Sequence, residues 1–156
     1  MPESWRTKLA RWQFNLFPAY RGTGGRLTYI SHDWTEVKVT IPLNWRTRNY
    51  VGTIYGGSLY GALDPIYMLM LMKRLGPEYV VWDKAASIRF RKPGRGRLYA
   101  TCTVPPELVV GIREELTRVD KLDREFTIEI VDPAGTVHAV VAKTIHVSRR
   151  GGGPST

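Results

Sequence analysis

The chain has 156 residues, of which 43% are hydrophobic and 24% are charged. This length fits a single domain, and this composition excludes a largely disordered chain, a fibrous repeat and a disulfide scaffold. Cys102 is the one cysteine, so no disulfide can form within the chain. A reducing, cytoplasmic location is therefore expected.

The net charge is +9, from 23 basic and 14 acidic residues. Such an excess fits an inert basic surface, an anionic small molecule such as a nucleotide-bearing cofactor, a nucleic acid or an anionic membrane. The basic residues are spread along the chain, and no helix-turn-helix pattern precedes the first predicted strand. We therefore expect no nucleic-acid partner.

Residues 1–17 are predicted to form an N-terminal helix that ends at Pro18. Large apolar residues recur at spacings of four, three and four, while the basic residues lie mostly off this stripe. The stripe comprises Trp5, Leu9, Trp12 and Leu16. The pattern leaves two interpretations open: a helix packed on the surface of the domain, or an anchor lying on a membrane surface.

Alternating apolar and polar residues predict six strands, with helices before, between and after them. The strands cover 26–31, 36–42, 80–91, 97–104, 124–131 and 136–147. A long apolar helix over 57–75 follows the second strand, and a helix over 106–119 follows the fourth. The order predicts an α+β domain over 1–148, in which a curved antiparallel sheet wraps around the central helix. The Gly-rich segment 149–156 is expected to be a disordered tail.

The central segment is too short and too interrupted to cross a membrane. Between Gly56 and Met72 the only charged residue is Asp64, but a spanning helix needs about 20 apolar residues. Asp64-Pro65 also stands in the middle of the run. A helix buried inside the fold is the better interpretation.

Gly56-Gly57 opens this helix, and Asp64 lies about two turns further on nearly the same face. Free N–H groups at a helix start favour a carbonyl oxygen or an anion, and small residues allow close approach. Pro65 cannot donate to the carbonyl group of Gly61, so a bend beside the carboxylate is expected. The alternative is that Asp64 only binds freed backbone groups or a buried arginine.

Asn49, Gly56, Gly57 and Asp64 together resemble the motif of the hotdog-fold acyl-CoA thioesterases of the phenylacetate-pathway type. The segments 88–94 and 132–139 resemble that superfamily's Pro-containing turn and its final hairpin. Gly-Gly-Ser-Leu, Ala-x-Asp-Pro and Val-Trp-Asp-Lys, within 56–65 and 81–84, are most similar to a branch known as a domain of unknown function. The resemblance covers about residues 9–147.

The resemblance implies a hotdog fold and hydrolysis of an acyl-CoA thioester. Asp64 would be the general base or nucleophile, the N–H group of Gly57 would polarise the carbonyl group, and Asn49 from a neighbouring subunit would position water or the carbonyl group. The family assembles as homodimers, often paired into homotetramers. No cofactor is implied beyond the coenzyme A moiety of the substrate.

Further residues are candidates for binding that substrate. Arg91, Lys92 and Arg95 could meet the coenzyme A phosphates, or they could form only a solvated hairpin end. The acyl group would run along Tyr60, Tyr67 and Met68, which could equally be plain core residues. Gly56 would lie beside it.

Tyr55 stands where the thioesterase pattern has a histidine that helps to orient the thioester. A tyrosine hydroxyl could donate a hydrogen bond there, but it would sit further out. This replacement leaves a second function open, the binding of an acyl thioester or fatty acyl group without catalysis. A hydratase is less favoured, because its chemistry usually needs a histidine near the central helix.

No metal site is expected. His138 and His146 share a strand face but are eight residues, or about 26 Å, apart. Cys102 is predicted to be a buried structural thiol. Trp82-Asp83-Lys84 fits either a structural ion pair or the wall of a site.

Overall fold

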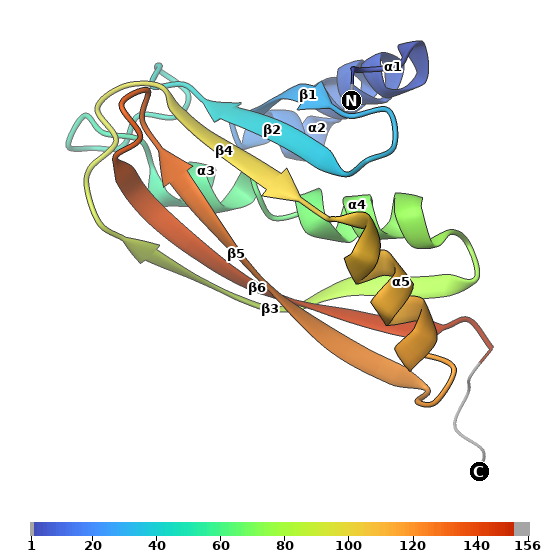
Figure 1. Ribbon diagram of the computed structural model, residues 1–156. Coiled ribbons are helices and arrows are strands. Elements are labelled where there is room, and N and C mark those ends of the chain that lie inside the picture. Colours follow the sequence, from blue (N-terminus) through green and yellow to red (C-terminus); the bar gives the residue numbers. More distant parts are fainter. Residues whose placement is uncertain (1, 152–156) are drawn as a thin grey trace.

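The computed structural model describes residues 2–151 and contains a six-stranded antiparallel sheet in the order β1-β2-β4-β5-β6-β3. The strands are β1 (Arg26–Ile30), β2 (Glu36–Ile41), β3 (Tyr79–Phe90), β4 (Leu98–Thr103), β5 (Lys121–Val131) and β6 (Val137–Arg149). The sheet curls around two helices, α3 (Gly56–Gly61) and α4 (Ile66–Leu75), which lie on its concave side (Figure 1). All six predicted strands are present, and the α+β architecture is confirmed.

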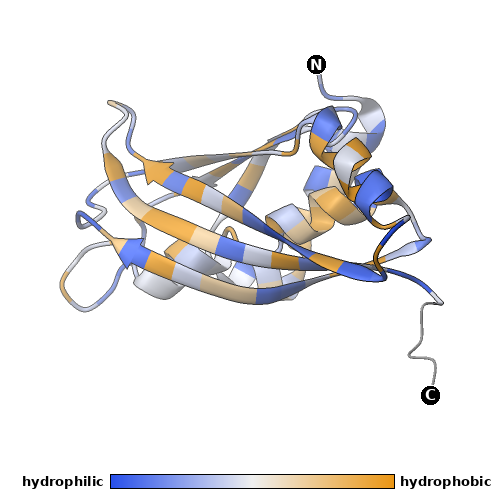
Figure 2. Cartoon of the chain, turned by 60° about the horizontal axis from the view of Figure 1, so that its bottom comes forward, coloured by the Kyte–Doolittle hydropathy of each residue, from blue (hydrophilic) through white to orange (hydrophobic). Residues whose placement is uncertain are grey.

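Alternation of side chains along the strands builds the core. Apolar and polar residues alternate along the sheet (Figure 2), and in β6 the buried positions recur at every second residue from Ala139 to Val147. These side chains meet the apolar residues of α4, among them Ile66, Met70 and Leu71, which are almost fully buried. The site therefore lies on a helix that is enclosed by the sheet.

The central helix is interrupted, so the prediction of one helix over 57–75 is wrong in its continuity. α3 ends at Gly61, four residues of turn follow, and α4 begins at Ile66. Pro65 has no N–H group to donate to Gly61, which explains the break. The hydroxyl group of Tyr20 donates to the carbonyl oxygen of Ala62 at 3.0 Å, so the break is stabilised from outside the helix.

The N-terminal helix is shorter than predicted and is followed by a second one. α1 (Trp5–Leu16) begins after Ser4, whose side chain accepts from the N–H group of Thr7 in a capping box. α2 (Pro18–Gly22) was not predicted, and Pro18 begins it, a position at which the missing N–H group is tolerated. α1 packs on the domain's surface, but the apolar stripe faces outward and Thr7 faces inward.

The C-terminal part follows the prediction with shifted boundaries. α5 (Pro106–Glu115) ends four residues earlier than expected, and β5 begins three residues earlier. β6 extends to Arg149, and the N–H group of Arg150 donates to the carbonyl oxygen of Glu78 at 2.7 Å. The predicted disordered tail therefore does not begin at residue 149, and residues 152–156 lie outside the described part.

Within residues 2–151, no helix has the length and apolar character needed to traverse a bilayer.

Candidate functional site

A buried lysine lies beneath the break in the central helix. The side chain of Lys143, on β6, is 0% exposed, and its Nζ lies 2.7 Å from Oδ1 of Asp83 and 3.2 Å from Oδ1 of Asp64. The ammonium group also donates to the main-chain carbonyl oxygen of Asp64. One cation therefore serves two carboxylates and a carbonyl group at the helix break, and we call these three residues the charge cluster.

Asp64 is held on one side only. Its Oδ1 accepts from the hydroxyl group of Tyr60 at 2.5 Å and from Lys143, whereas no described residue donates to its Oδ2. The Asp64 side chain is 46% exposed, so Oδ2 is accessible to water. Burial, and then the neighbouring Asp64, raise the pKa of Tyr60 well above its usual range, so this hydroxyl group remains a donor near neutral pH.

Asp83 is the more enclosed carboxylate of the charge cluster. Burial raises the pKa of Asp83, and the hydrogen bond and charge of Lys143 oppose that rise. Its neighbour Lys84 points elsewhere and pairs with Asp123 at 2.5 Å. Asp83 and Lys84 thus form ion pairs with partners on other strands and not with each other.

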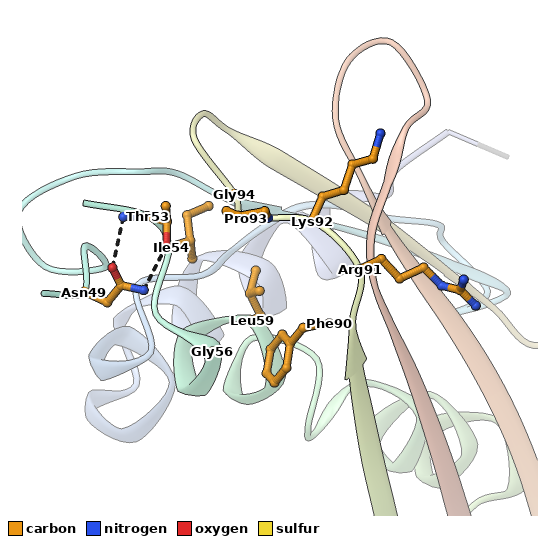
Figure 3. A pocket seen from close by; sticks show the side chains of 10 residues that line it. All are labelled: Asn49, Thr53, Ile54, Gly56, Leu59, Phe90, Arg91, Lys92, Pro93 and Gly94. Carbon is orange, nitrogen blue, oxygen red and sulfur yellow. Dashed lines mark hydrogen bonds between the residues drawn. The ribbon is translucent and has the colours of Figure 1, made fainter. Parts of the chain in front are cut away.

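A separate hollow of about 370 Å³ opens near the start of α3. It lies between the loop that carries Asn49 and the end of β3, and Figure 3 shows Leu59 and Phe90 close together at its floor. Of the predicted site residues, the hollow brings together Asn49, Gly56, Arg91 and Lys92. Arg95 and Asp64 do not line it.

Asn49 is engaged within its own loop. Its Oδ1 accepts from the N–H groups of Val51 and Thr53 at 3.1 and 3.0 Å, and its amide nitrogen donates to the Thr53 hydroxyl group at 2.9 Å (Figure 3). These bonds shape the loop that walls the hollow. One amide hydrogen is left for any further contact.

The backbone at Gly56 and Gly57 is closely covered by aromatic rings. A Cβ atom on Gly56 would lie 2.8 Å from the ring of Phe90, and one on Gly57 would lie 2.3 Å from the ring of Tyr55. Only glycine fits at either position without movement of these rings. Tyr55 itself is exposed, and its main-chain oxygen accepts from the N–H groups of Ser58 and Leu59, which follow the glycine pair.

Tyr67 and Met68 lie away from the hollow. Tyr67 is buried, with its ring stacked on Phe126 at a centroid distance of 4.1 Å, and its hydroxyl group accepts from the N–H group of Thr103 at 3.4 Å. Burial raises the pKa of Tyr67 to about 12. Met68 packs partly buried against the core. Both fit the core interpretation that the sequence left open.

Lys143 and Asp83 were not among the predicted site residues. The sequence did carry a signal, because Lys143 interrupts an otherwise apolar strand face. A charge at a core-facing position needs a buried partner, and Asp64 is the one acidic residue of the central segment. That pairing could have been inferred, whereas the contribution of Asp83 depends on the pairing of β3 with β6.

The two histidines of the last strand bind separate carboxylates. His138 lies 3.2 Å from Asp132, and His146 lies 2.8 Å from Asp123. Within residues 2–151, no three histidine, cysteine or acidic side chains are grouped as metal ligands. Cys102 is fully buried.

Solved structures share this fold. A Pseudomonas aeruginosa protein described as a "probable thioesterase" is 21% identical, with a TM-score of 0.81 over 96% of this chain and 99% of that chain. A Haemophilus influenzae thioesterase is 16% identical, with a TM-score of 0.66 over 88% and 87% of the two chains. The Escherichia coli PaaI protein, from the phenylacetic acid degradation operon, is 19% identical, with a TM-score of 0.63 over 95% and 94%.

These likenesses define the class: the chain has a hotdog fold, as the motifs around Asp64 predicted. A family model described as a domain of unknown function, DUF4442, matches residues 6–147. The chain therefore belongs to the DUF4442 family, and the predicted resemblance is confirmed. No curated protein matches the sequence.

Proposed function

We propose that the protein hydrolyses acyl thioesters of coenzyme A, with Asp64 as the general base. The observation that supports this most directly is the one-sided binding of the carboxylate. Tyr60 and Lys143 donate hydrogen bonds to Oδ1 of Asp64, while its Oδ2 has no donor among the described residues and is accessible to water. A carboxylate that is fixed in orientation with one free oxygen is suited to accept a proton from an attacking water molecule.

The reaction balances with water as the only co-reactant. Oδ2 of Asp64 accepts a proton as the water oxygen bonds to the thioester carbonyl carbon, and the carbon–sulfur bond then breaks. The proton passes to the departing thiolate, which leaves a carboxylic acid and coenzyme A. An N–H group at the start of α3, that of Gly57, would stabilise the developing oxyanion.

Two chains are needed to complete this site. Gly57 and Asp64 are seven positions apart, across most of α3 and part of the turn that follows it. At the helical rise of about 1.5 Å per residue this is roughly 10 Å, too far for both to contact one carbonyl group. β3 is an edge strand, and its central residues Lys84, Ala85, Ala86 and Ser87 are exposed. An exposed strand edge presents unpaired backbone N–H and C=O groups, which favours pairing with another strand. We propose a homodimer through β3, in which Gly57 and Asp64 of different chains face one thioester.

The hollow would receive the coenzyme A moiety. Arg91 and Lys92 extend from the end of β3 at its rim (Figure 3), and both are exposed. Guanidinium and ammonium groups bind phosphate oxygens through charge-assisted hydrogen bonds. Arg95 is exposed on the same turn without lining the hollow, so it is proposed only as a longer-range charge.

The test is the release of coenzyme A from short, long and aromatic acyl-CoAs by wild type, Asp64→Asn and Asp123→Asn. Asp64→Asn is expected to lower turnover at least about 100-fold, because general base catalysis contributes that much or more. Asp123→Asn removes an exposed ion-paired carboxylate and should retain full turnover. Full activity in a folded Asp64→Asn variant would show that Asp64 is not the base.

One observation favours a second function, the binding of acyl thioesters without turnover. The Tyr55 ring lies against the α carbon of Gly57, next to the N–H group that a carbonyl group would have to approach. Wild-type protein that binds acyl-CoA in calorimetry and releases no coenzyme A would support this binding function and contradict hydrolysis.

A further inference from the structure

The apolar stripe of α1 lies on the outside of the molecule. Trp5 is 71% exposed and Trp12 is 62% exposed, and Leu9 and Leu16 are also exposed. An amphipathic helix on a domain surface usually turns such a stripe toward the core. This helix turns its stripe toward solvent.

The contacts of the opposite face fix this orientation. Thr7 is buried, the ring of Phe14 packs on that of Tyr20 at 4.5 Å, and Asn15 exchanges hydrogen bonds with the backbone of Leu27 at 2.8 and 2.9 Å. At 100° per residue, Thr7 and Phe14 lie about half a turn away from the stripe, and Asn15 lies about a quarter turn away. The helix therefore cannot rotate its stripe inward without losing these bonds.

A third tryptophan joins the stripe across a cleft. Trp45, in the loop after β2, is 83% exposed, and it lines a cleft of about 540 Å³ together with Trp12 and Leu16. The same cleft is lined by three arginines, Arg21, Arg26 and Arg46, and by no acidic residue. We call Trp5, Trp12, Leu16, Trp45 and these arginines the tryptophan face.

Basic residues also border the stripe along the helix. Arg6 and Lys8 are exposed on its two sides, and the guanidinium group of Arg6 lies 5.3 Å from the centroid of the Trp5 ring. Arg46 lies 5.8 Å from the Trp45 ring centroid, so the charges and the rings form one surface. Indole rings and basic groups together are typical of helices that lie in the headgroup region of a membrane.

The charge of the tryptophan face distinguishes between its possible partners, a second copy of this chain and an anionic lipid surface. A second copy of the same face would bring arginines against arginines, in a chain whose net charge is already +9. An anionic lipid surface complements those charges, and each basic group near it strengthens binding. α1 packs against β1, whereas β3 is the opposite edge strand, so dimerisation through β3 would leave the face free (Figure 1).

We propose that the tryptophan face docks the protein on anionic phospholipid bilayers. α1 lies in the plane of the interface, with Trp5, Trp12 and Trp45 inserted among the headgroups and the arginines against lipid phosphates. The protein is held at the surface and does not span the bilayer. This inference does not depend on the thioesterase proposal.

The experiment is flotation of the 156-residue chain with vesicles of phosphatidylcholine alone or of phosphatidylcholine and phosphatidylglycerol in equal parts. Wild type should float with the anionic vesicles at low salt and much less with the neutral ones. The double variant Trp5→Ser, Trp12→Ser should bind at least about tenfold more weakly. Arg21→Gln with Arg26→Gln should lower affinity roughly 20- to 30-fold on the anionic vesicles only.

Val110→Ser is the control, because Val110 is a 52% exposed apolar residue on α5, outside both the tryptophan face and β3. It should float like wild type, and circular dichroism should show all variants folded. Absence of wild-type flotation would overturn the proposal, as would undiminished flotation of the Trp5, Trp12 variant. Self-association of the free protein that this variant abolishes would overturn it too, and would assign the face to a second copy.

Discussion

The charge cluster and the tryptophan face each reverse an ordinary rule of burial, and they do so in opposite ways. The charge cluster places an ammonium group where apolar side chains belong, and the tryptophan face leaves indole rings in water. Lys143 finds its partners within the chain, on the helix break and on β3. The indole rings of Trp5, Trp12 and Trp45 are not covered by apolar side chains within residues 2–151. The charge cluster is therefore satisfied within one chain, whereas the tryptophan face is left exposed to contact another surface.

Replacing Lys143 should have the largest effect on stability. Lys143→Met leaves two carboxylates close together without their cation, and removal of one partner from a buried pair typically costs about 3 kcal/mol or more. Urea unfolding would measure this loss. The matched variant Lys84→Met breaks the exposed pair with Asp123 and should cost about 1 kcal/mol or less. Equal losses of unfolding free energy in the two variants would mean that the buried Lys143 contributes no more to stability than an exposed ion pair does.

The next largest difference in stability is expected between substitutions on the two faces of α1. Phe14→Ala removes a ring that packs on Tyr20 and should cost about 2 kcal/mol, somewhat less than for a fully buried ring. Trp12→Ala removes a larger ring from the exposed face and should change stability by no more than about 0.5 kcal/mol. Thermal unfolding of both variants checks this. A large loss for Trp12→Ala would show that the stripe is already covered within the chain.

The smallest expected effect is a pH dependence from Asp83. Because its pKa is raised in the folded protein, the folded state retains a proton that the unfolded chain releases at about pH 4. Stability should therefore fall as the pH rises from about 4 through the raised pKa, and Asp83→Asn should remove this decline. Urea unfolding across that range measures it.

Asp123 is a control, because its contribution to stability should change with pH in the opposite direction to that of Asp83. Hydrogen bonds from Lys84 and His146 lower the pKa of Asp123, so its contribution is present above the ordinary aspartate range and is lost as the pH falls through the lowered value. Asp123→Asn should therefore flatten the acid side of the profile and leave the Asp83 decline in place. If stability still declines with rising pH in Asp83→Asn, the decline arises from another titrating group.

Much of the fold could be predicted because it rests on local patterns. Alternation of apolar residues located all six strands, and Pro65 and Pro18 marked the places where helices end or begin. The hotdog class followed from a resemblance to a known family, which Asn49, Gly56, Gly57 and Asp64 carry together with the segments 88–94 and 132–139. The break in the central helix was expected as a bend, because a proline cannot donate to Gly61 whatever surrounds it.

Sequence patterns thus predicted the six strands, the fold class and the position of Asp64 in the central segment, but not α2. Which residues the helices, the strands and Asp64 contact depends on the tertiary structure. Periodicity defines a stripe on α1 but not the direction in which it points, which the bonds of Asn15 to Leu27 set. Likewise, only the pairing of β3 with β6 brings Asp83 to Lys143, since strand pairing depends on contacts between residues some 60 positions apart. Burial and partners are properties of the packed chain, and no local pattern contains them.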